Sequence, residues 1–289
     1  MTNHKLLLAA GVGLLVAAQP STADTLLDDD FNNSNLAVNP DIGGGFVFQD
    51  NGVGAGGSAT EAGSLAQITD GSANNTAGIR STNAFDLSDS SLTYSVSWEV
   101  GSWDMTTGQT PERVFFTLQT NDSWMFAGDA EESRIILAIT ANNTVGSGES
   151  NTASLRYQNR SASSNTNFFT DLFDLGSLDD DPDGFTATLT FDATSFSFTT
   201  TGLDATNQVN ISDTWANLGT DFATAFGTDG AVHVAAYVQD AGPTDDITDF
   251  NRGELDIDRI TLTAVPEPGS LALLGLGGLL IAARRRRKA

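Results

Sequence analysis

The stretch Leu92-Thr93-Tyr94-Ser95-Val96-Ser97-Trp98-Glu99-Val100 alternates apolar and polar residues without a break. Side chains of a β-strand point alternately to the two faces of a sheet, so this pattern predicts a strand with one face in a core and one face in water. Phe185–Phe191 alternates in the same way, and after Asp192-Ala193-Thr194 the pattern resumes through Phe196 and Phe198. These last two segments are therefore predicted to form a hairpin.

Other apolar segments follow the same period and are separated by turns rich in Gly, Asn and Asp, which predicts further short strands. The run Ile135–Ile139 is apolar at every position, which is typical of a strand covered on both faces. The further candidates are Gly45–Gln49, Leu65–Thr69, Val114–Gln119, Arg134–Thr140, Ser154–Gln158, Val232–Val238 and Leu255–Thr263.

One segment has a different period. Trp215, Leu218, Phe222 and Phe226 are spaced by three and four residues, which predicts a short helix that Asp213 or Thr214 could cap. Nothing else between residues 24 and 264 has a helical pattern. About ten short strands with one helix predict an all-β fold, an antiparallel β-sandwich of the jelly-roll kind.

The last 25 residues have three parts: Val265-Pro266-Glu267-Pro268, an apolar run over 269–283, and five cations over 284–288. Pro266 and Pro268 lack the backbone donor, so the motif is expected to end the folded body. Fifteen helical residues span roughly 22 Å, less than a hydrocarbon core of about 30 Å, but flanking cations can snorkel and extend that length. We therefore predict a transmembrane helix over 269–283. A buried core helix is the alternative, and the lack of a polar face disfavours it.

This tail resembles the PEP-CTERM sorting signal of Gram-negative bacteria that make exopolysaccharide. The resemblance covers Val265, Pro266, Glu267 and Pro268, the apolar helix and the basic end, in that order. It implies that the protein is exported, is held transiently in the inner membrane, and is processed near the Pro-Glu-Pro motif by an exosortase.

The beginning of the chain is predicted to be a signal peptide. His4-Lys5 precede an apolar run over 6–18, and Ser21-Thr22-Ala23 supplies small residues for cleavage after Ala23. Positive charge flanks both apolar segments on their outer sides, so both ends are expected to stay cytoplasmic while the rest is exported through the Sec translocon. The predicted organisation is a signal peptide over 1–23, a β-sandwich over 24–264 and the sorting signal over 265–289.

Composition limits what the body can do. The chain has 37 acidic and 13 basic residues, and six of the basic residues lie in the two terminal segments. The remaining seven are arginines, so residues 24–268 carry a formal charge of −30, which disfavours nucleic acid as a partner. The chain has no cysteine, and the body has no lysine and only one histidine, His233. An ordinary zinc site and most nucleophilic mechanisms therefore have no residues to use, and we assign no catalytic residue.

A possible calcium loop occurs at Asp179-Asp180-Asp181-Pro182-Asp183-Gly184. Asp179, Asp181 and Asp183 have the spacing of the first calcium ligands of an EF-hand loop, although Thr190 stands where the closing carboxylate is expected. The alternative is a plain Pro-Asp-Gly turn, in which Gly184 takes a positive φ. Calcium is thus a candidate cofactor.

A second set of carboxylates lies in Glu254-Leu255-Asp256-Ile257-Asp258. It is similar to the Glu-x-Asp-x-Glu signature of concanavalin-like glycoside hydrolases, in which two carboxylates on one strand face act together. The third acid is Asp258 in place of Glu, and the motif lies on the last strand. The other interpretation is a terminal strand with a polar outer face.

The body as a whole, from Asp28-Asp29-Asp30-Phe31 to the strand at Asp256–Ile260, is similar to concanavalin and laminin-G sandwiches. In such a fold, Trp103 and Trp124 lie beside loop-like sequence and could offer exposed indoles on which a sugar stacks. Packing in the core or at the sandwich edge is the alternative for both.

Together these features predict a non-enzymatic, exported protein of the cell surface or extracellular matrix, associated with exopolysaccharide and biofilm. The first alternative is a calcium-dependent carbohydrate-binding module. The second is a glycoside hydrolase built on a concanavalin-like fold.

Overall fold

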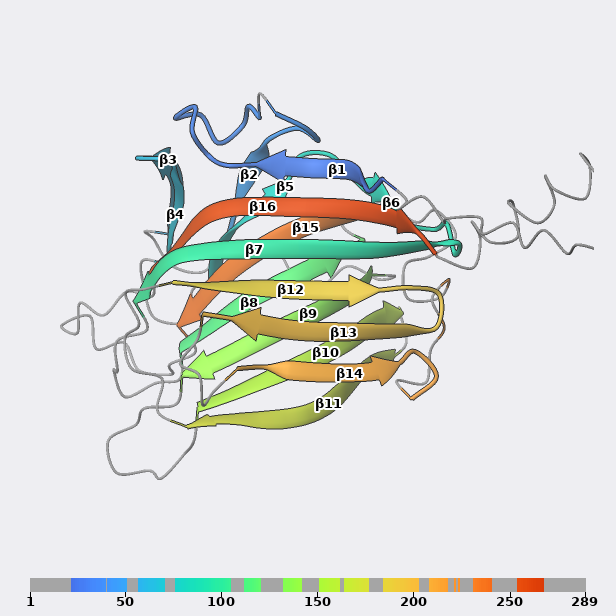
Figure 1. Ribbon diagram of the computed structural model, residues 1–289. Helices are drawn as coiled ribbons and strands as arrows, with labels where there is room; N and C mark the ends of the chain where they lie inside the picture. Colours follow the sequence, from blue (N-terminus) through green and yellow to red (C-terminus); the bar gives the residue numbers. More distant parts are fainter. Residues whose placement is uncertain are drawn as a thin grey trace, which may run out of the picture.

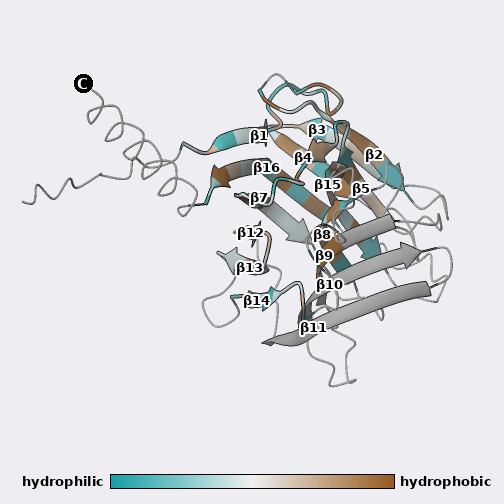
Figure 2. Cartoon of the chain, turned by 90° about the vertical axis from the view of Figure 1, so that its right-hand side faces the viewer, coloured by the Kyte–Doolittle hydropathy of each residue, from teal (hydrophilic) through white to brown (hydrophobic). Residues whose placement is uncertain are grey.

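The computed structural model describes fourteen parts of the chain; they contain sixteen strands, and Ala223, a single described residue within the predicted short helix, is helical. The strands form two antiparallel sheets that lie one behind the other (Figure 1). The perpendicular view shows the sheets face to face (Figure 2), so the fold is the antiparallel β-sandwich that the alternating sequence predicts. The described residues are 22–39, 41–50, 57–70, 76–104, 112–120, 132–141, 151–161, 164–176, 184–202, 208–217, 221, 223, 231–240 and 254–267.

The first sheet is built around two strands of 13 residues each, β7 (Leu92–Asp104) and β16 (Glu254–Pro266). Its order is β14 (Asn210–Thr214), β13 (Ser195–Thr201), β12 (Phe185–Phe191), β7, β16, β4 (Leu65–Thr69) and β3 (Ser58–Ala62). An eighth strand, β1 (Asp24–Asp29), also pairs with β16. The predicted hairpin is confirmed, because Leu189 of β12 stands opposite Phe198 of β13.

The second sheet has the order β11 (Ser164–Gly176), β10 (Asn151–Ser161), β9 (Glu132–Ala141), β8 (Glu112–Gln119), β15 (Ala231–Asp240), β5 (Thr76–Ser81) and β2 (Phe46–Asp50). The two-residue strand β6 (Phe85–Asp86) pairs with the start of β15. Strands that are neighbours in the chain therefore often belong to different sheets.

The core lies between the sheets and is rich in aromatic rings. Trp98 of β7 is fully buried, and its ring centroid lies 5.4 Å from that of Phe116 on β8. Phe185 of β12 packs edge-on against Phe116 at 5.9 Å and so links the two sheets. Burial along β12 alternates strictly, as the phase of its sequence predicts.

The second sheet is covered on both faces. A second buried cluster lies on its outer side, away from the sandwich core: Phe115, Ile136, Ala138, Ala235 and Tyr237. All five residues of Ile135–Ile139 are buried, which confirms the prediction from their continuous hydrophobicity.

The predicted short helix lies mostly outside the described residues, as Leu218, Phe222 and Phe226 do. Its first residue, Trp215, lies in a turn that follows β14. The indole is buried, stacks at 4.8 Å on Phe196, and donates a hydrogen bond of 2.8 Å from Nε1 to the carbonyl of Asp192. Trp215 thus joins the chain after β14 to the turn between β12 and β13.

Strand β16 continues to Pro266, two residues past the predicted end of the sandwich at residue 264. Glu267 donates its N–H to the carbonyl of Ser91, so the N–H groups of alternate residues face β7 and the nitrogen of Pro266 faces the other side. There the pairing with β1 has already ended, at Ala264 opposite Asp24. The missing donor of Pro266 therefore costs no ladder hydrogen bond.

Both predicted terminal segments lie outside the described residues, except Thr22 and Ala23 of the signal peptide and Val265, Pro266 and Glu267 of the sorting motif. In the part of the chain that the structure describes, no helix has the length and hydrophobicity needed to cross a membrane.

Candidate functional site

An acidic loop follows β1 and begins with Asp28-Asp29-Asp30-Phe31. Phe31 has a φ of 50°, which is unusual for a non-glycine residue, and its side chain is fully buried against Phe46 at 5.4 Å. Burial of this ring turns the chain inward. As a result Asp29 is only 1% exposed, and its Oδ1 accepts the N–H of Phe31 at 3.0 Å.

A second carboxylate reaches the loop from β3. Glu61 is buried, and its Oε1 accepts the N–H groups of Asn33 at 2.6 Å and Ser34 at 2.5 Å. The other carboxylate oxygens, Glu61 Oε2 and Asp29 Oδ2, are buried and have no hydrogen-bond partner in the described parts of the chain. The loop thus contains two buried acids, each with one satisfied and one unsatisfied oxygen.

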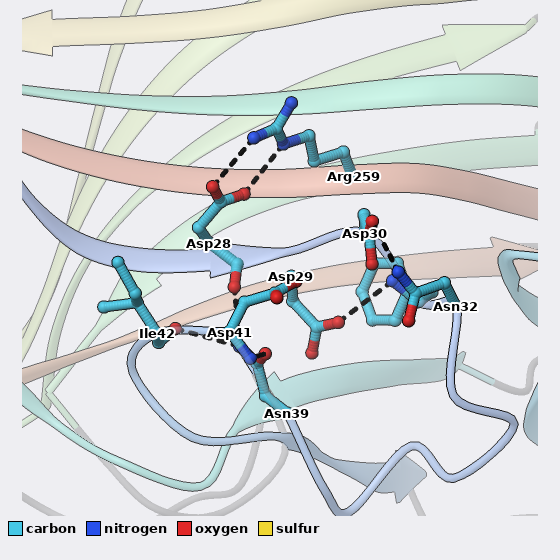
Figure 3. Close-up of polar contacts among 9 residues, drawn as sticks. Asp28, Asp29, Asp30, Asn32, Asn39, Asp41, Ile42 and Arg259 are labelled. Atoms are coloured by element: carbon cyan, nitrogen blue, oxygen red, sulfur yellow. Dashed lines mark hydrogen bonds and ion pairs between the residues drawn. The ribbon is translucent and has the colours of Figure 1, made fainter.

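The surroundings of Asp29 shift the pKa of its carboxyl group. Burial raises the pKa of Asp29 to about 7, against the lowering effect of the Phe31 N–H, and the nearby charges of Glu61, Asp30 and Asp41 raise it further. Figure 3 shows Asp28 turned toward Arg259 of β16, whereas Asp29 lies on the opposite side of β1. Arg259 donates to Asp28 through Nε and Nη2, both at 2.7 Å, and that pair raises the pKa of Arg259.

Carboxylate oxygens are the ligands that calcium prefers. Across the ranges that the structure describes, however, no three acidic or histidine side chains are arranged to hold a metal ion. What the described contacts give the acidic loop is a buried carboxyl group, Asp29, with a pKa of about 7.

The three carboxylates of β16 lie on the outer face of the first sheet. Glu254 is exposed, and Asp256 accepts a hydrogen bond of 2.8 Å from the hydroxyl of Ser102. In the pairing of β16 with β7, Asp258 of β16 and Gly101 of β7 have no opposite residue. The ladder therefore contains one β-bulge on each strand. Burial and the charge of Asp256 raise the pKa of Asp258.

Gly101 allows this bulge. A Cβ at Gly101 would lie 2.7 Å from Oδ1 of Asp258, which is closer than real Cβ contacts come. The bulge also shifts the phase of β7 by one residue, so that Trp103 stands opposite Leu255 and points into the core.

The burial of Trp103 contradicts the prediction that its indole is exposed and stacks against a sugar. It is 5% exposed, and its ring packs edge-on against Phe185 at a centroid distance of 5.3 Å. A ring buried in this way cannot present a face to a glycan. The sequence signal for this outcome is Gly101, because a glycine inside an alternating strand marks a bulge.

The other predicted ligand residues, Asp179, Asp181, Asp183 and Trp124, lie outside the described residues. Gly184, which ends the predicted calcium loop, is described and has a φ of 71°, as the turn interpretation predicts. A Cβ there would lie 2.2 Å from the carbonyl oxygen of Val100, so this position requires glycine.

His233, the one histidine of the body, lies on the outer face of the second sheet. Its Nδ1 is 2.7 Å from Nη1 of Arg80 and 2.9 Å from the carbonyl oxygen of Ser81. On the same face, the hydroxyl of Tyr237 donates to Oε1 of Gln119 at 3.1 Å. His233 is therefore a buried, hydrogen-bonded residue of the sheet.

An open hollow of about 570 Å³ lies over β12, β13 and β14. One end of it is the turn at Asp192, where the N–H groups of Thr194 and Ser195 donate to Oδ1 at 2.7 and 2.8 Å. Burial alone would raise the pKa of Asp192, but these bonds and the Thr194 and Ser195 hydroxyl bonds lower it below its usual value. The lining contains five hydroxyl side chains, two carboxylates and two aromatic residues: Thr190, Phe191, Asp192, Ser195, Phe196, Ser197, Ser212, Asp213 and Thr214.

Comparison with known proteins agrees with this architecture. Residues 264–288 match the PEP-CTERM protein-sorting motif. No curated protein matches the chain in sequence. Similar solved structures include a basic winged bean lectin with Tn-antigen (TM-score 0.53, 11% identity, covering 85% of this chain and 99% of the lectin).

An endo-1,3-β-glucanase from Streptomyces sioyaensis is equally similar, with a TM-score of 0.53, 16% identity and coverage of 86% of this chain and 99% of the glucanase. A Bauhinia forficata lectin in complex with GalNAc has a TM-score of 0.50 and 9% identity, and covers 85% and 99% of the two chains. The body is thus a concanavalin-like, lectin-like β-sandwich. It carries a PEP-CTERM sorting signal, which marks an exported substrate of an exosortase.

Proposed function

We propose that the protein is a non-enzymatic, carbohydrate-binding component of the extracellular matrix, delivered to the surface of a Gram-negative cell and associated with exopolysaccharide. The observation that carries this proposal is the combination of a lectin-like sandwich with an exosortase sorting signal on its last strand. The route runs through the Sec translocon and a transient stay in the inner membrane.

The positions of the carboxylates support the proposal that the protein is not an enzyme. Glycoside hydrolysis needs two carboxyl groups held at a fixed separation across a sugar ring. On the outer face of the second sheet, the positions from Arg113 to Gln119 on β8 and from His233 to Gln239 on β15 include no Asp or Glu. On β16 the bulge at Asp258 breaks the regular spacing of the three acids.

The hollow over β12–β14 is the proposed glycan surface. Sugars are bound through their hydroxyl groups, and the hollow offers serine and threonine hydroxyls, while the rings of Phe191 and Phe196 are buried beneath it. Trp215 and the Asp192 turn hold its floor in place. This surface lies on the outer face of the first sheet, where Ser212 is exposed.

The test is retention of the released protein on the producing organism's own exopolysaccharide. Ser212→Trp fills the hollow, and Asn210→Trp is the matched control, because Asn210 is exposed on the same strand but does not line the hollow. We expect retention in the wild type and in the Asn210 variant and a loss of at least tenfold in the Ser212 variant. Equal retention of all three would reject the hollow as the binding surface, and no retention of any would reject carbohydrate binding.

The two alternatives are tested in the same experiment. Excess chelator should not change retention through the hollow; if it abolishes retention, the calcium-dependent interpretation and the loop at Asp179, Asp181 and Asp183 take precedence. Turnover of a β-glucan that disappears in Glu254→Gln would support the glycoside hydrolase.

A further inference from the structure

We infer that the exosortase cut lies on the C-terminal side of Glu267, so that the mature protein keeps Val265, Pro266 and Glu267 as the end of β16. This inference rests on the proposed sorting route and adds the position of the cut. It follows from the backbone pairing of the sorting motif, which begins inside the sandwich.

The first three residues of the motif are held by β7. Val265 stands opposite Thr93 and Pro266 opposite Leu92, and the N–H of Glu267 donates to the carbonyl of Ser91 at 3.1 Å. Leu92, in turn, packs against the hydrophobic core. The register is continuous with the centre of the sheet, because β16 is paired with β7 from Ile260 to Pro266 without interruption.

Such pairing protects a peptide bond from cleavage. A processing enzyme must bind the backbone around the bond that it cuts, and a backbone paired within a sheet becomes available only after local opening. Opening back to Ala264 would also expose a core residue, since Ala264 is 5% exposed and lies between β1 and β7. Bonds up to Pro266–Glu267 are therefore disfavoured sites.

The apolar run limits the position of the cut on the other side. It begins at Gly269, so Pro268 alone separates it from Glu267, the last residue bonded to the sheet. The Glu267–Pro268 bond precedes a proline, so the first ordinary peptide bond past the sheet is Pro268–Gly269. In its hydrolysis the C–N bond breaks, the Pro268 carbonyl carbon takes the oxygen of water, and the amine of Gly269 takes a proton. The cut is placed at Glu267–Pro268, at Pro268–Gly269 or at a later bond.

The experiment is mass spectrometry of the released protein made from the full chain in the exosortase-bearing producer. A C-terminal peptide that contains Glu267 is the expected result. A C-terminus at Pro266 or earlier would overturn the inference while leaving exosortase processing intact. A chain that still ends at Ala289 would overturn the processing itself and this inference with it.

A cross-link gives a second, independent readout. Thr93→Cys with Val265→Cys places two cysteines at directly opposite positions, about 5.5 Å apart between Cα atoms, within the range of a disulfide. The chain has no other cysteine to interfere. We expect the oxidised double variant to be processed within twofold of both single variants. A loss of at least tenfold that a reductant restores would show that the strand end must open, and would reject the proposed position.

Discussion

Protonation of Asp29 should control how the stability of the sandwich depends on pH. The carboxyl group is 1% exposed and lies near Glu61, Asp30 and Asp41, and burial raises its pKa from 3.8 to about 7. The folded state therefore holds a proton that the unfolded state releases at lower pH. By linkage, the contribution of Asp29 to stability is fully present below about pH 4 and is lost as the pH rises toward 7.

The size of the effect follows from that rise. Each pKa unit corresponds to about 1.4 kcal/mol, so the rise from 3.8 to about 7 sets an upper limit of about 4.5 kcal/mol. Local opening that admits water to the acidic loop would reduce it, and we expect a loss of about 2 to 4 kcal/mol between pH 4 and pH 8. Asp29→Asn should remove this loss, because an amide oxygen can still accept the Phe31 N–H without carrying charge.

The assay is denaturant unfolding of the wild type, Asp29→Asn and Asp24→Asn from pH 4 to pH 8. Asp24 is an exposed residue of the same strand, so its replacement makes the same charge change without the burial. The control also accounts for the general repulsion of a chain with a formal net charge of −24. The reasoning is refuted if Asp29→Asn and Asp24→Asn show the same dependence on pH as the wild type.

Two substitutions test the packing. Gly78→Ala places a Cβ 2.2 Å from Cδ1 of Tyr237, so we expect a loss of about 3 kcal/mol or more in unfolding free energy, and a loss below about 1 kcal/mol would contradict the close contact. Trp103→Phe should lower stability by about 1 to 3 kcal/mol while leaving retention on exopolysaccharide unchanged, because the indole packs on Phe185 in the core. Weaker retention at unchanged stability would restore Trp103 as a sugar contact.

The hairpin β12–β13 was predictable because its information is local. Phe185–Phe191 alternates in one phase and the turn at Asp192 restarts it, so both the strands and their pairing could be derived from sequence. The pairing of β16 between β1 and β7 could not, since it joins segments that lie far apart in the chain, such as Glu254 with Asp104 and Ala264 with Asp24, and has no signature in either strand. The alternation predicts which face is buried but not which strand lies beside it.

The site residues were hard to predict because their surroundings depend on how the strands pair. Trp103 was expected beside a loop because its neighbours are loop-like, but it lies inside β7, and the bulge at Gly101 turns its indole into the core. The acidic loop was visible as Asp28-Asp29-Asp30, but the charge of Glu61, which adds to the raised pKa of Asp29, comes from another strand. The hollow at Ser212 likewise combines three strands of the first sheet.

The position of β16 connects folding to sorting. This strand is the last of the body to be exported, yet it completes the first sheet by pairing with β1 and β7 at once. Until the residues next to the apolar run have emerged, β1 has no partner in that sheet and the core beneath Ile260 and Leu262 stays open. The cut that we infer beyond Glu267 would leave every paired residue of that strand in the released sandwich.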